Sequence, residues 1–323
     1  MENWKENNVW HGLKVISLFD GMSCWMIALE RAWIKVDTYY ASEIDKYATQ
    51  ISEKNYPNII RLWDVNNWRD WNLWEIDLII CGSPCQWFSF AGKQLAFDDT
   101  RSKLFFTMVD IINYYKPKYF LLENVRMKKE YQDIITEYMW VNPININSKL
   151  VSAQLRNRFY WTNIHWVEQP KDKWIIIQDI LEENVEDKYY LTDKQIRSLW
   201  RFGSNSRFYD IMWKSPTLTT SQWWHRQPKI AYNDYSDQIL WNKARSLNTG
   251  CWSNTTKNAT IILDVYEKTK RKLTPIECER LQTLPDNYTE WVSNSQRYKM
   301  IGNWWTVDVI AHILWWLTYL LEK

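Results

Sequence analysis

The sequence predicts an α/β protein with a doubly wound, largely parallel sheet and a smaller second domain inserted before the C-terminal helices. In the first half, short apolar runs typical of buried strands alternate with stretches of helical periodicity. From about residue 166 this alternation changes to polar loops and short strands, and helical periodicity returns after residue 273. We therefore expect a sheet domain over 1–165, an inserted domain over 166–270, and a segment over 271–323 that completes the first domain.

The composition of each run predicts the individual elements. Apolar, branched and aromatic residues dominate four runs, which we expect to form strands at 14–19, 36–42, 76–81 and 118–125. Between these runs, apolar residues recur at helical spacing over 26–32, 45–55 and 103–115. Later in the chain we expect a hairpin or strand pair over 150–164 and helices over 274–284 and 305–323.

The overall composition, with 46% hydrophobic and 24% charged residues among 323, is that of a globular protein. No apolar run approaches the roughly 20 residues of a membrane span, and the first residues lack the apolar core of a secretory signal. These features predict a cytoplasmic protein with no membrane partner. The five cysteines have no metal-site spacing, and their odd number argues against a disulfide framework, so we expect reduced thiols and no metal.

Tryptophan and glycine occur in unusual numbers. The chain has 24 Trp and only 7 Gly, whereas glycine normally makes up about 7% of residues. Several tryptophans stand where a turn favours glycine, among them Trp33, Trp63, Trp223 and Trp224. Because the excess is spread along the whole chain, it does not indicate a local aromatic surface. We expect that Trp replaces Gly at many sites.

The stretch 81-CGSPCQWFSFAGK-93 places a thiol in a polar loop after an apolar run. Gly82, Ser83 and Pro84 end the expected strand at 76–81, so Cys85 follows its carboxyl end. Open α/β sheets place their ligands and chemistry at that edge. Cys85 is therefore a candidate nucleophile, although a small buried apolar residue is the alternative for any single cysteine.

A candidate nucleotide site follows the first expected strand. The turn 20-DGMSCW-25 precedes a helix, and the backbone N–H groups of such a turn suit a nucleotide-type ligand. Glu43 lies about 20 residues beyond the turn, where an acidic side chain can bind ribose hydroxyls. Asp64 could bind an adenine amino group in the same way. A solvated surface acid is the alternative for each residue.

The expected inserted domain contains a basic stretch. Seven Lys or Arg residues between 194 and 229 stand against one acid, Asp210, in a chain with a net charge of +2. Such a patch can face phosphates, and an ordinary solvated face is the equally weighted alternative. The seven positions are 194, 197, 201, 207, 214, 226 and 229.

A series of motifs in one order covers nearly the whole chain apart from its middle. They are 18-LFDG-21, 43-EIDKYA-48, 83-SPCQ-86, 88-FSFAGKQ-94, 123-ENV-125, 154-QLRNR-158, 273-LTPIECERLQTLPDNYT-289 and 301-IGN-303. With these motifs the chain resembles the C5-cytosine DNA methyltransferases of the bacterial and phage type. The resemblance implies a Rossmann-like S-adenosylmethionine-dependent methyltransferase fold with an inserted target-recognition domain. It also implies double-stranded DNA as the partner, bound by a monomer.

The resemblance assigns roles to individual residues. Cys85 would add to C6 of cytosine, Glu123 would protonate or hydrogen-bond N3, and Arg156 and Arg158 would orient the base and the Cys85 loop. For the two arginines a surface salt bridge is the alternative. The implied cofactor is S-adenosylmethionine, and the implied cofactor contacts are Phe19, Gly21, Met22, Glu43, Ile44, Asp64, Val65, Pro84 and Asn303.

The same chemistry requires the target base to leave the duplex, because a stacked cytosine is out of reach. The loop at 86–103 would close over the flipped base. The implied DNA contacts are Gln86, Ser89, Arg201, Arg207, Lys214, Thr217, Thr219 and Arg226.

Two other functions stay open. One is a tRNA-methylating relative, although the Cys-Phe-Thr triplet usual in that branch is absent from this sequence. The other is a DNA-binding protein with a methyltransferase fold but impaired catalysis. Trp63, Trp87 and Trp304 stand near the expected cofactor pocket and nucleophile, where large indoles can disturb packing.

Overall fold

The computed structural model describes residues 11–82, 100–192, 194–196, 208–219, 229–231 and 270–321. The chain divides into two compact units. Unit 1 consists of Met1–Asn147, Asn157–Pro170 and Val307–Lys323, and unit 2 consists of Ser148–Arg156 and Lys171–Thr306. The expected C-terminal segment 271–323 is thus shared, because its first part belongs to unit 2.

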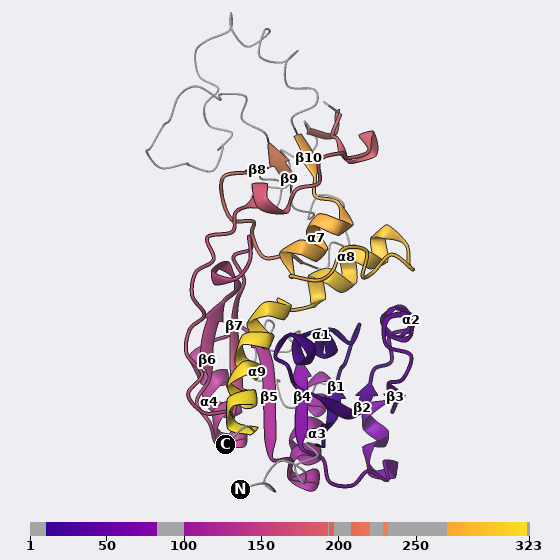
Figure 1. Cartoon of the computed structure of the whole chain (residues 1–323), viewed down its shortest axis with the longest axis vertical. Coiled ribbons are helices and arrows are strands. Elements are labelled where there is room, and N and C mark those ends of the chain that lie inside the picture. Colours follow the sequence, from indigo (N-terminus) through magenta and orange to yellow (C-terminus); the bar gives the residue numbers. More distant parts are fainter. Residues whose placement is uncertain are drawn as a thin grey trace, which may run out of the picture. The chain divides into compact units, whose positions relative to one another are not determined.

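Unit 1 contains a sheet whose described strands follow the order β3-β2-β1-β4-β5-β7-β6 (Figure 1). The first five of these pair in parallel, and β7 runs antiparallel to both β5 and β6. This arrangement confirms the predicted doubly wound α/β fold. The strands are β1 (Leu13–Leu18), β2 (Val36–Ser42), β3 (Ile60–Arg61), β4 (Leu78–Gly82), β5 (Tyr119–Val125), β6 (Ile144–Asn147) and β7 (Asn157–Thr162).

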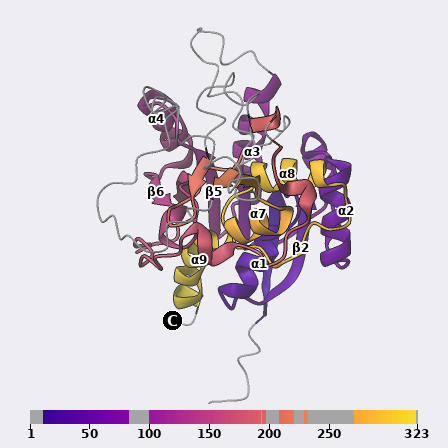
Figure 2. The same cartoon turned by 90° about the horizontal axis from the view of Figure 1, so that it is seen from above.

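Helices cover the sheet of unit 1. Ile16 and Leu18 on β1 share a buried cluster with Phe105 of α3 and Ile135 of α4, so these helices pack on one face. In the view from above, α2 lies toward the β2 edge and α4 toward the β6 edge (Figure 2). The helical elements are α1 (Cys24–Arg31), α2 (Lys46–Asn55), the 3-10 helix η1 (Val65–Asp70), α3 (Thr100–Tyr115), α4 (Lys129–Met139) and α9 (Val307–Leu321).

The last helix, α9, packs against α1. Arg31 at the end of α1 forms an ion pair of 2.7 Å with Asp308, and Thr318 donates a hydrogen bond of 2.6 Å to the carbonyl of Ala32. These contacts fix both ends of α9. None of the helices in the described part of the chain combines the length and hydropathy that crossing a bilayer requires.

The strand pair predicted at 150–164 differs from the structure. β7 lies in that range, but its partner β6 precedes it, and the residues between them form the 3-10 helix η3 (Ser148–Leu150) and turns. The amide of Ser148 donates to the carbonyl of Arg156 over 2.9 Å, which closes this excursion of the chain. Ala153 of this excursion joins the buried apolar cluster of unit 2, whereas Leu155 is exposed.

Unit 2 contains a small sheet of order β10-β9-β8, with β8 and β9 parallel and β9 and β10 antiparallel. The helix α8 was not expected, and Asn303 is its last residue. The remaining elements are η4 (Ile177–Ile180), η5 (Asp187–Tyr189), β8 (Phe208–Asp210), β9 (Lys229–Ala231), β10 (Lys270–Lys272), α7 (Pro275–Leu281) and α8 (Asn294–Asn303).

The motif 273–289 builds the buried centre of unit 2. Thr274 and Glu277 form a capping box at the start of α7, which supplies partners for amides that a helix start leaves unpaired. Glu277 also pairs with Arg271 at 2.6 Å, and both side chains are fully buried. Glu279 accepts hydrogen bonds from Arg297 and from the Thr289 amide, each at 2.9 Å. The motif thus stabilises the unit from inside.

Among the described residues, five tryptophans adopt the left-handed backbone conformation, with φ between 57° and 60°. Glycine reaches this region without steric cost, whereas a large side chain is strained there. The sequence indicated such positions at Trp33 and Trp63. The five are Trp33, Trp63, Trp140, Trp166 and Trp174.

Candidate active site

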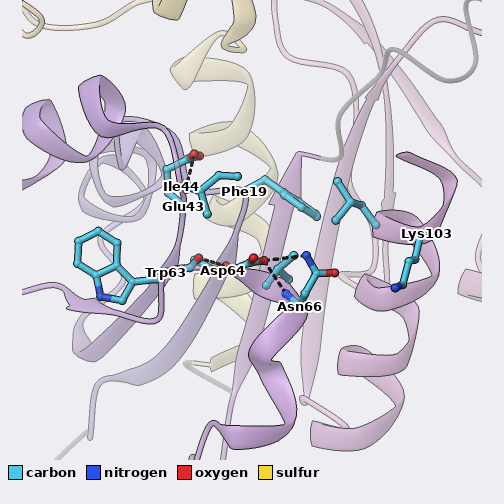
Figure 3. Close-up of a pocket in the computed structure, with 10 residues that line it drawn as sticks. Phe19, Glu43, Ile44, Trp63, Asp64, Asn66 and Lys103 are labelled. Atoms are coloured by element: carbon cyan, nitrogen blue, oxygen red, sulfur yellow. Dashed lines mark hydrogen bonds between the residues drawn. The ribbon is translucent and has the colours of Figure 1, made fainter. Parts of the chain in front are cut away.

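A pocket of about 540 Å³ lies beside the carboxyl ends of β1 and β2 in unit 1 (Figure 3). Its volume falls within the range of small-molecule sites. Five predicted cofactor contacts line it, namely Phe19, Glu43, Ile44, Asp64 and Val65. The full lining is Phe19, Ser42, Glu43, Ile44, Trp63, Asp64, Val65, Asn66, Lys103 and Leu104.

The other predicted cofactor contacts lie elsewhere. Gly21 belongs to the turn beside the pocket but does not line it, and Met22 is only 1% exposed. Asn303 belongs to unit 2. Pro84 lies outside the described residues. These four contacts stay predictions.

Glu43 connects the end of β2 to the turn after β1. Its Oε2 accepts a hydrogen bond of 2.8 Å from the Gly21 amide, and its Oε1 accepts bonds of 2.7 Å from the amides of Ile44 and Asp45. A carboxylate offers about four acceptor positions. Three are used by the backbone, so the rigidly held carboxylate of Glu43 keeps one for a ligand hydroxyl.

Asp64 begins η1 at the opposite side of the same pocket, as Figure 3 shows. Its Oδ1 accepts hydrogen bonds from the backbone and side-chain nitrogens of Asn66 at 2.9 and 2.8 Å. The preceding residue, Trp63, has φ 57° and its carbonyl accepts a bond of 2.7 Å from Ser42. Among the described residues Asp64 Oδ2 has no hydrogen-bond donor, so it is available to an amino group of a ligand.

The turn after β1 contains three residues with a left-handed backbone, Phe19, Gly21 and Ser23. Inside it, the Ser23 hydroxyl donates to the Asp20 carboxylate, and the Tyr39 hydroxyl donates to the same carboxylate over 2.6 Å. Asp20 is completely buried, and burial raises its pKa to about 6. The sequence motif identified the turn but not this buried network.

Glu123 lies on β5, opposite Gly82 of β4 and Tyr160 of β7. Its side chain is buried, and Arg158 Nε lies 2.9 Å from Glu123 Oε1. The guanidinium fixes the direction of the carboxyl group. The Glu123–Arg158 pair thus lies on the strands beside β4, and the sheet partner of Glu123, Gly82, precedes Cys85 by three positions.

The residues that follow β4 are Pro84, Cys85, Gln86 and Ser89, and they lie outside the described residues. Cys81, in contrast, is the last residue but one of β4 with 1% exposure, and its Sγ lies 3.1 Å from Met108 Sδ. Burial raises the pKa of the Cys81 thiol far above its ordinary range. Cys81 therefore stays protonated near neutral pH and is unsuited to act as a nucleophile.

Arg156 does not share partners with Arg158. It belongs to unit 2, where its guanidinium donates to the carbonyls of Leu218 at 3.0 Å, Gly302 at 3.3 Å and Trp304. The side chain is 2% exposed. Arg156 thus joins three segments of unit 2 from within, and its contact with a base stays a prediction.

Only some of the basic side chains between 194 and 229 are exposed to solvent. Lys214 Nζ donates to the carbonyls of Lys149 at 2.8 Å, Ser152 at 3.1 Å and Ile175, and burial lowers its pKa. An ammonium has three donors, so none remains for a phosphate in this conformation. The DNA contact of Lys214 stays a prediction, and it would require Lys214 to give up one of these carbonyls.

The other residues of this stretch differ in exposure. Lys229 is fully buried on β9, and burial lowers its pKa to about 8. Thr217 donates to the carbonyl of Leu155 over 2.6 Å, while Thr219 and Lys194 are exposed. Outside the described residues lie Arg197, Arg201, Arg207 and Arg226.

Sequence reasoning missed several pocket residues. Asn66 follows Asp64 by two positions and could have been found as its local hydrogen-bond partner. Lys103 and Leu104 come from the start of α3, and no signal in the sequence places that helix beside η1. Their place in the pocket lining follows only from the three-dimensional structure.

Comparisons with known proteins agree with this geometry. The family model described as C-5 cytosine-specific DNA methylase matches residues 13–140 and 144–316. The chain is 30% identical over 317 residues to the type II methyltransferase M.NlaX of Neisseria lactamica, covering 93% of this chain and 94% of that one. It is also 30% identical to M1.ScrFI of Lactococcus lactis subsp. cremoris, covering 98% of this chain and 81% of that one.

Solved structures share the fold. The Entamoeba histolytica methyltransferase EhMeth superposes with a TM-score of 0.73 at 18% identity, covering 97% of this chain and all of that chain. The S. pombe Dnmt2 methyltransferase superposes with a TM-score of 0.69 at 16% identity, covering 96% of this chain and 99% of that one. At such identities the similarity establishes the fold alone.

Proposed function

Because the chain belongs to the C-5 cytosine-specific DNA methylase family, we propose that it transfers a methyl group to C5 of a cytosine in a specific sequence of duplex DNA. The methyltransferases of this family use S-adenosylmethionine as methyl donor. The observation that carries the proposal is the pairing of Glu43 and Asp64 across one pocket of about 540 Å³. That pocket lies in the same unit as β4, whose carboxyl end leads to Cys85.

The pocket residues fit the chemical groups of the cofactor. The free acceptor position of Glu43 suits a ribose hydroxyl, and Asp64 Oδ2 suits the adenine amino group. Phe19, Ile44 and Val65 supply apolar surface for the purine ring. S-adenosylmethionine supplies the electrophilic methyl group when bound there.

The nucleophile in this proposal is Cys85. Cytosine C5 is too electron-poor to take a methyl group directly, so the Cys85 thiolate first bonds to C6 and moves electron density to C5. Glu123 holds N3 by a hydrogen bond or a proton, and Arg158 fixes the direction of its carboxyl group. After methyl transfer, loss of the C5 proton restores the double bond and releases the sulfur.

The target cytosine has to leave the helix before Cys85 can reach C6. Gln86 and Ser89 follow the nucleophile in sequence. They are proposed to contact the flipped nucleotide or the space that it leaves in the duplex. Arg201, Arg207 and Arg226 are proposed to bind phosphates within the target-recognition segment at 166–270. We propose that one copy of the chain acts on each site.

The test is incubation with labelled S-adenosylmethionine and a panel of duplexes, followed by bisulfite sequencing. Cys85→Ser should abolish transfer and leave DNA binding intact, whereas Cys81→Ser, the matched buried control, should change only stability. A duplex with 5-fluorocytosine at the target should trap an adduct through Cys85, since fluorine cannot leave as a proton does. Equal transfer by Cys85→Ser and the parent would refute the assignment.

The DNA surface is tested separately by reversing charge at Arg201, Arg207 and Arg226. Each lost phosphate contact should reduce the slope of log K against log salt by about 0.9. Lys116→Glu, an exposed lysine of unit 1 outside the basic stretch, serves as the control. An unchanged slope in the triple variant would show that these arginines form only a solvated face. Cofactor binding without transfer to any duplex would favour a non-catalytic DNA-binding protein.

A further inference from the structure

We propose that Asp20 is a positioning residue that holds the cofactor-binding turn in its binding conformation. The inference rests on the proposed cofactor site, because the turn from Phe19 to Ser23 borders that pocket. Asp20 is fully buried, so it acts on the cofactor through the turn and not by direct contact.

Asp20 joins four elements of unit 1. Its carboxylate accepts hydrogen bonds from Ser23 at the start of α1 and from Tyr39 on β2 at 2.6 Å. Arg61 on β3 places Nη1 4.0 Å from Oδ2. The Ser23 hydroxyl also bonds to the hydroxyl of Ser52 on α2. One buried carboxylate thus connects the turn to β2, β3 and α2.

Arg61 makes this carboxylate necessary. Its side chain is 12% exposed, and its Nε and Nη1 are buried without a hydrogen-bond partner among the described residues. A buried cation requires a counter-charge, and Asp20 is its ion-pair partner. Ser23 needs support as well, because a residue with a side chain at φ 59° persists only where the surroundings hold it.

Protonation provides a way to weaken the network without mutation. Burial raises the pKa of Asp20 to about 6, while Ser23, Tyr39 and Arg61 oppose that shift. The titratable and charged groups around it are Tyr39 on β2, Arg61 on β3 and Cys24 on α1, which lies close to Tyr39. Below pH 6 the carboxylate gains a proton, which removes the cost of burying its charge. The same proton takes away the charge opposite Arg61 and one acceptor position, so the turn loses the contacts that hold its binding conformation.

The test is calorimetry of S-adenosylmethionine binding without DNA, from pH 5.5 to pH 8, on the parent and on Asp20→Asn. The parent should bind more weakly as pH falls through 6. Asp20→Asn should bind about tenfold more weakly at pH 8 and should lose the pH dependence, because a charge-assisted contact is removed. Its kcat at saturating cofactor should change far less than its KM.

Two further variants complete the test. Asp133→Asn, an exposed residue on α4, is the matched control and should behave as the parent. Tyr39→Phe removes one donor and should shift affinity in the same direction by less. Parent-like affinity and pH profile in Asp20→Asn would overturn the proposal. Lost methyl transfer with intact cofactor binding would instead count against the proposed function.

An independent observation carries a second inference. We infer that these five tryptophans with a left-handed backbone are glycines in the protein as its own organism makes it. The cause would be one codon that this organism reads as Gly and that the printed sequence translates as Trp. Their indoles are exposed by 84, 55, 87, 63 and 80% at Trp33, Trp63, Trp140, Trp166 and Trp174. An exposed indole gains little from packing, yet each of these backbones favours glycine.

The composition supports the same assignment. At about 7% glycine, a chain of 323 residues would contain about 23 glycines. This chain has 7 glycines, which is about 16 fewer than expected, and its 24 tryptophans are numerous enough to account for the missing glycines. Trp161 shows that other tryptophans are genuine, because it is fully buried and its Nε1 donates to Thr136 over 3.0 Å.

Peptide mass mapping of the protein isolated from the organism that encodes it tests this inference. Glycine is expected at 33, 63, 140, 166 and 174, with tryptophan retained at Trp161 as the internal control. The gene should use one codon at all five turn positions and a different codon at Trp161. Tryptophan found by mass at the five turn positions would overturn the inference.

Discussion

The pocket of unit 1 and the helical centre of unit 2 use carboxylates in opposite ways. Beside the pocket, Glu43 and Asp64 accept hydrogen bonds from backbone amides and keep part of their acceptor capacity free. In unit 2, Glu277 and Glu279 are fully buried and paired with arginines. The contrast shows that a carboxylate with free hydrogen-bond acceptor positions is available to bind a ligand. A carboxylate whose acceptor positions are all occupied contributes to stability instead.

The largest effect is expected from breaking a pair in unit 2. Arg271→Ala leaves the Glu277 carboxylate buried without its cation, which should lower the free energy of unfolding by about 3–5 kcal/mol. Urea unfolding measures the change. The double variant Arg271→Met with Glu277→Leu should recover most of the loss, since it leaves no buried charge. A small loss in the single variant would contradict the structural role of this pair.

The neighbouring arginines of the QLRNR motif should separate stability from activity. Arg156→Ala removes contacts to three backbone carbonyls and should lower the free energy of unfolding by about 2–3 kcal/mol. Arg158→Ala should leave stability closer to the parent but lower kcat about a hundredfold, because Glu123 loses its orientation. Paired unfolding curves and single-turnover rates test the contrast. If the two variants lost the same amount of stability and of single-turnover rate, the proposed difference between Arg156 and Arg158 would be contradicted.

The two regions should also respond to pH in opposite directions. Lys229 in unit 2 has a pKa lowered to about 8, so the unfolded chain binds more protons above pH 8 and stability rises toward pH 10. Asp20 in unit 1 has a pKa raised to about 6, so its contribution makes stability fall as pH rises from about 4 to 6.

Lys229→Met tests the basic arm of this pH dependence. It should raise stability at pH 7 by about 1–3 kcal/mol and flatten the rise above pH 8, as measured by thermal unfolding across pH. Lys272, whose pKa burial also lowers, would retain a smaller rise. An undiminished rise in the variant would show that Lys229 is not its source.

Glu43→Gln should act on ligand binding more than on folding. The amide keeps one acceptor oxygen but loses the charge that holds three backbone amides, so cofactor affinity should fall about tenfold. Calorimetry measures it, and Glu53→Gln, an exposed residue on α2, is the matched control. Unchanged affinity would mean that the pocket does not use this carboxylate.

The smallest effect is expected at a turn. Trp63→Gly should raise the free energy of unfolding by about 1 kcal/mol, because glycine adopts φ 57° without strain. Trp315→Gly, on the exposed side of α9, should lower it by about 1 kcal/mol through helix propensity. Thermal unfolding distinguishes the two, and destabilisation by Trp63→Gly would show that its indole makes a native contact.

These comparisons show which parts of the molecule the sequence could predict. Parallel strands place their carboxyl ends at one edge, so the turn after β1, Glu43 and Asp64 were found from local pattern alone. The polar helix α8 has no apolar stripe that would reveal it. Lys214 could not be interpreted either, since its three carbonyl partners lie 39 to 65 positions away in the chain.

The spacing of Arg156 and Arg158 did not reveal that the two residues lie in different units. Two positions apart, they were expected to act together, but the chain passes from unit 2 to unit 1 between them. Each arginine then takes its partners from its own unit. Local spacing predicts shared function only where the residues lie on one continuous element.

The docking of α9 on α1 has a consequence for biosynthesis. Residues 307–323 belong to unit 1, although more than a hundred residues of unit 2 are synthesised before them. While the ribosome makes that stretch, α1 lacks the ion pair to Asp308 and the apolar cover of α9. During this interval the apolar surface of α1 stays exposed, and unit 1 completes its folding only when α9 has been synthesised. A chaperone that binds apolar helix surfaces would find its target in this interval.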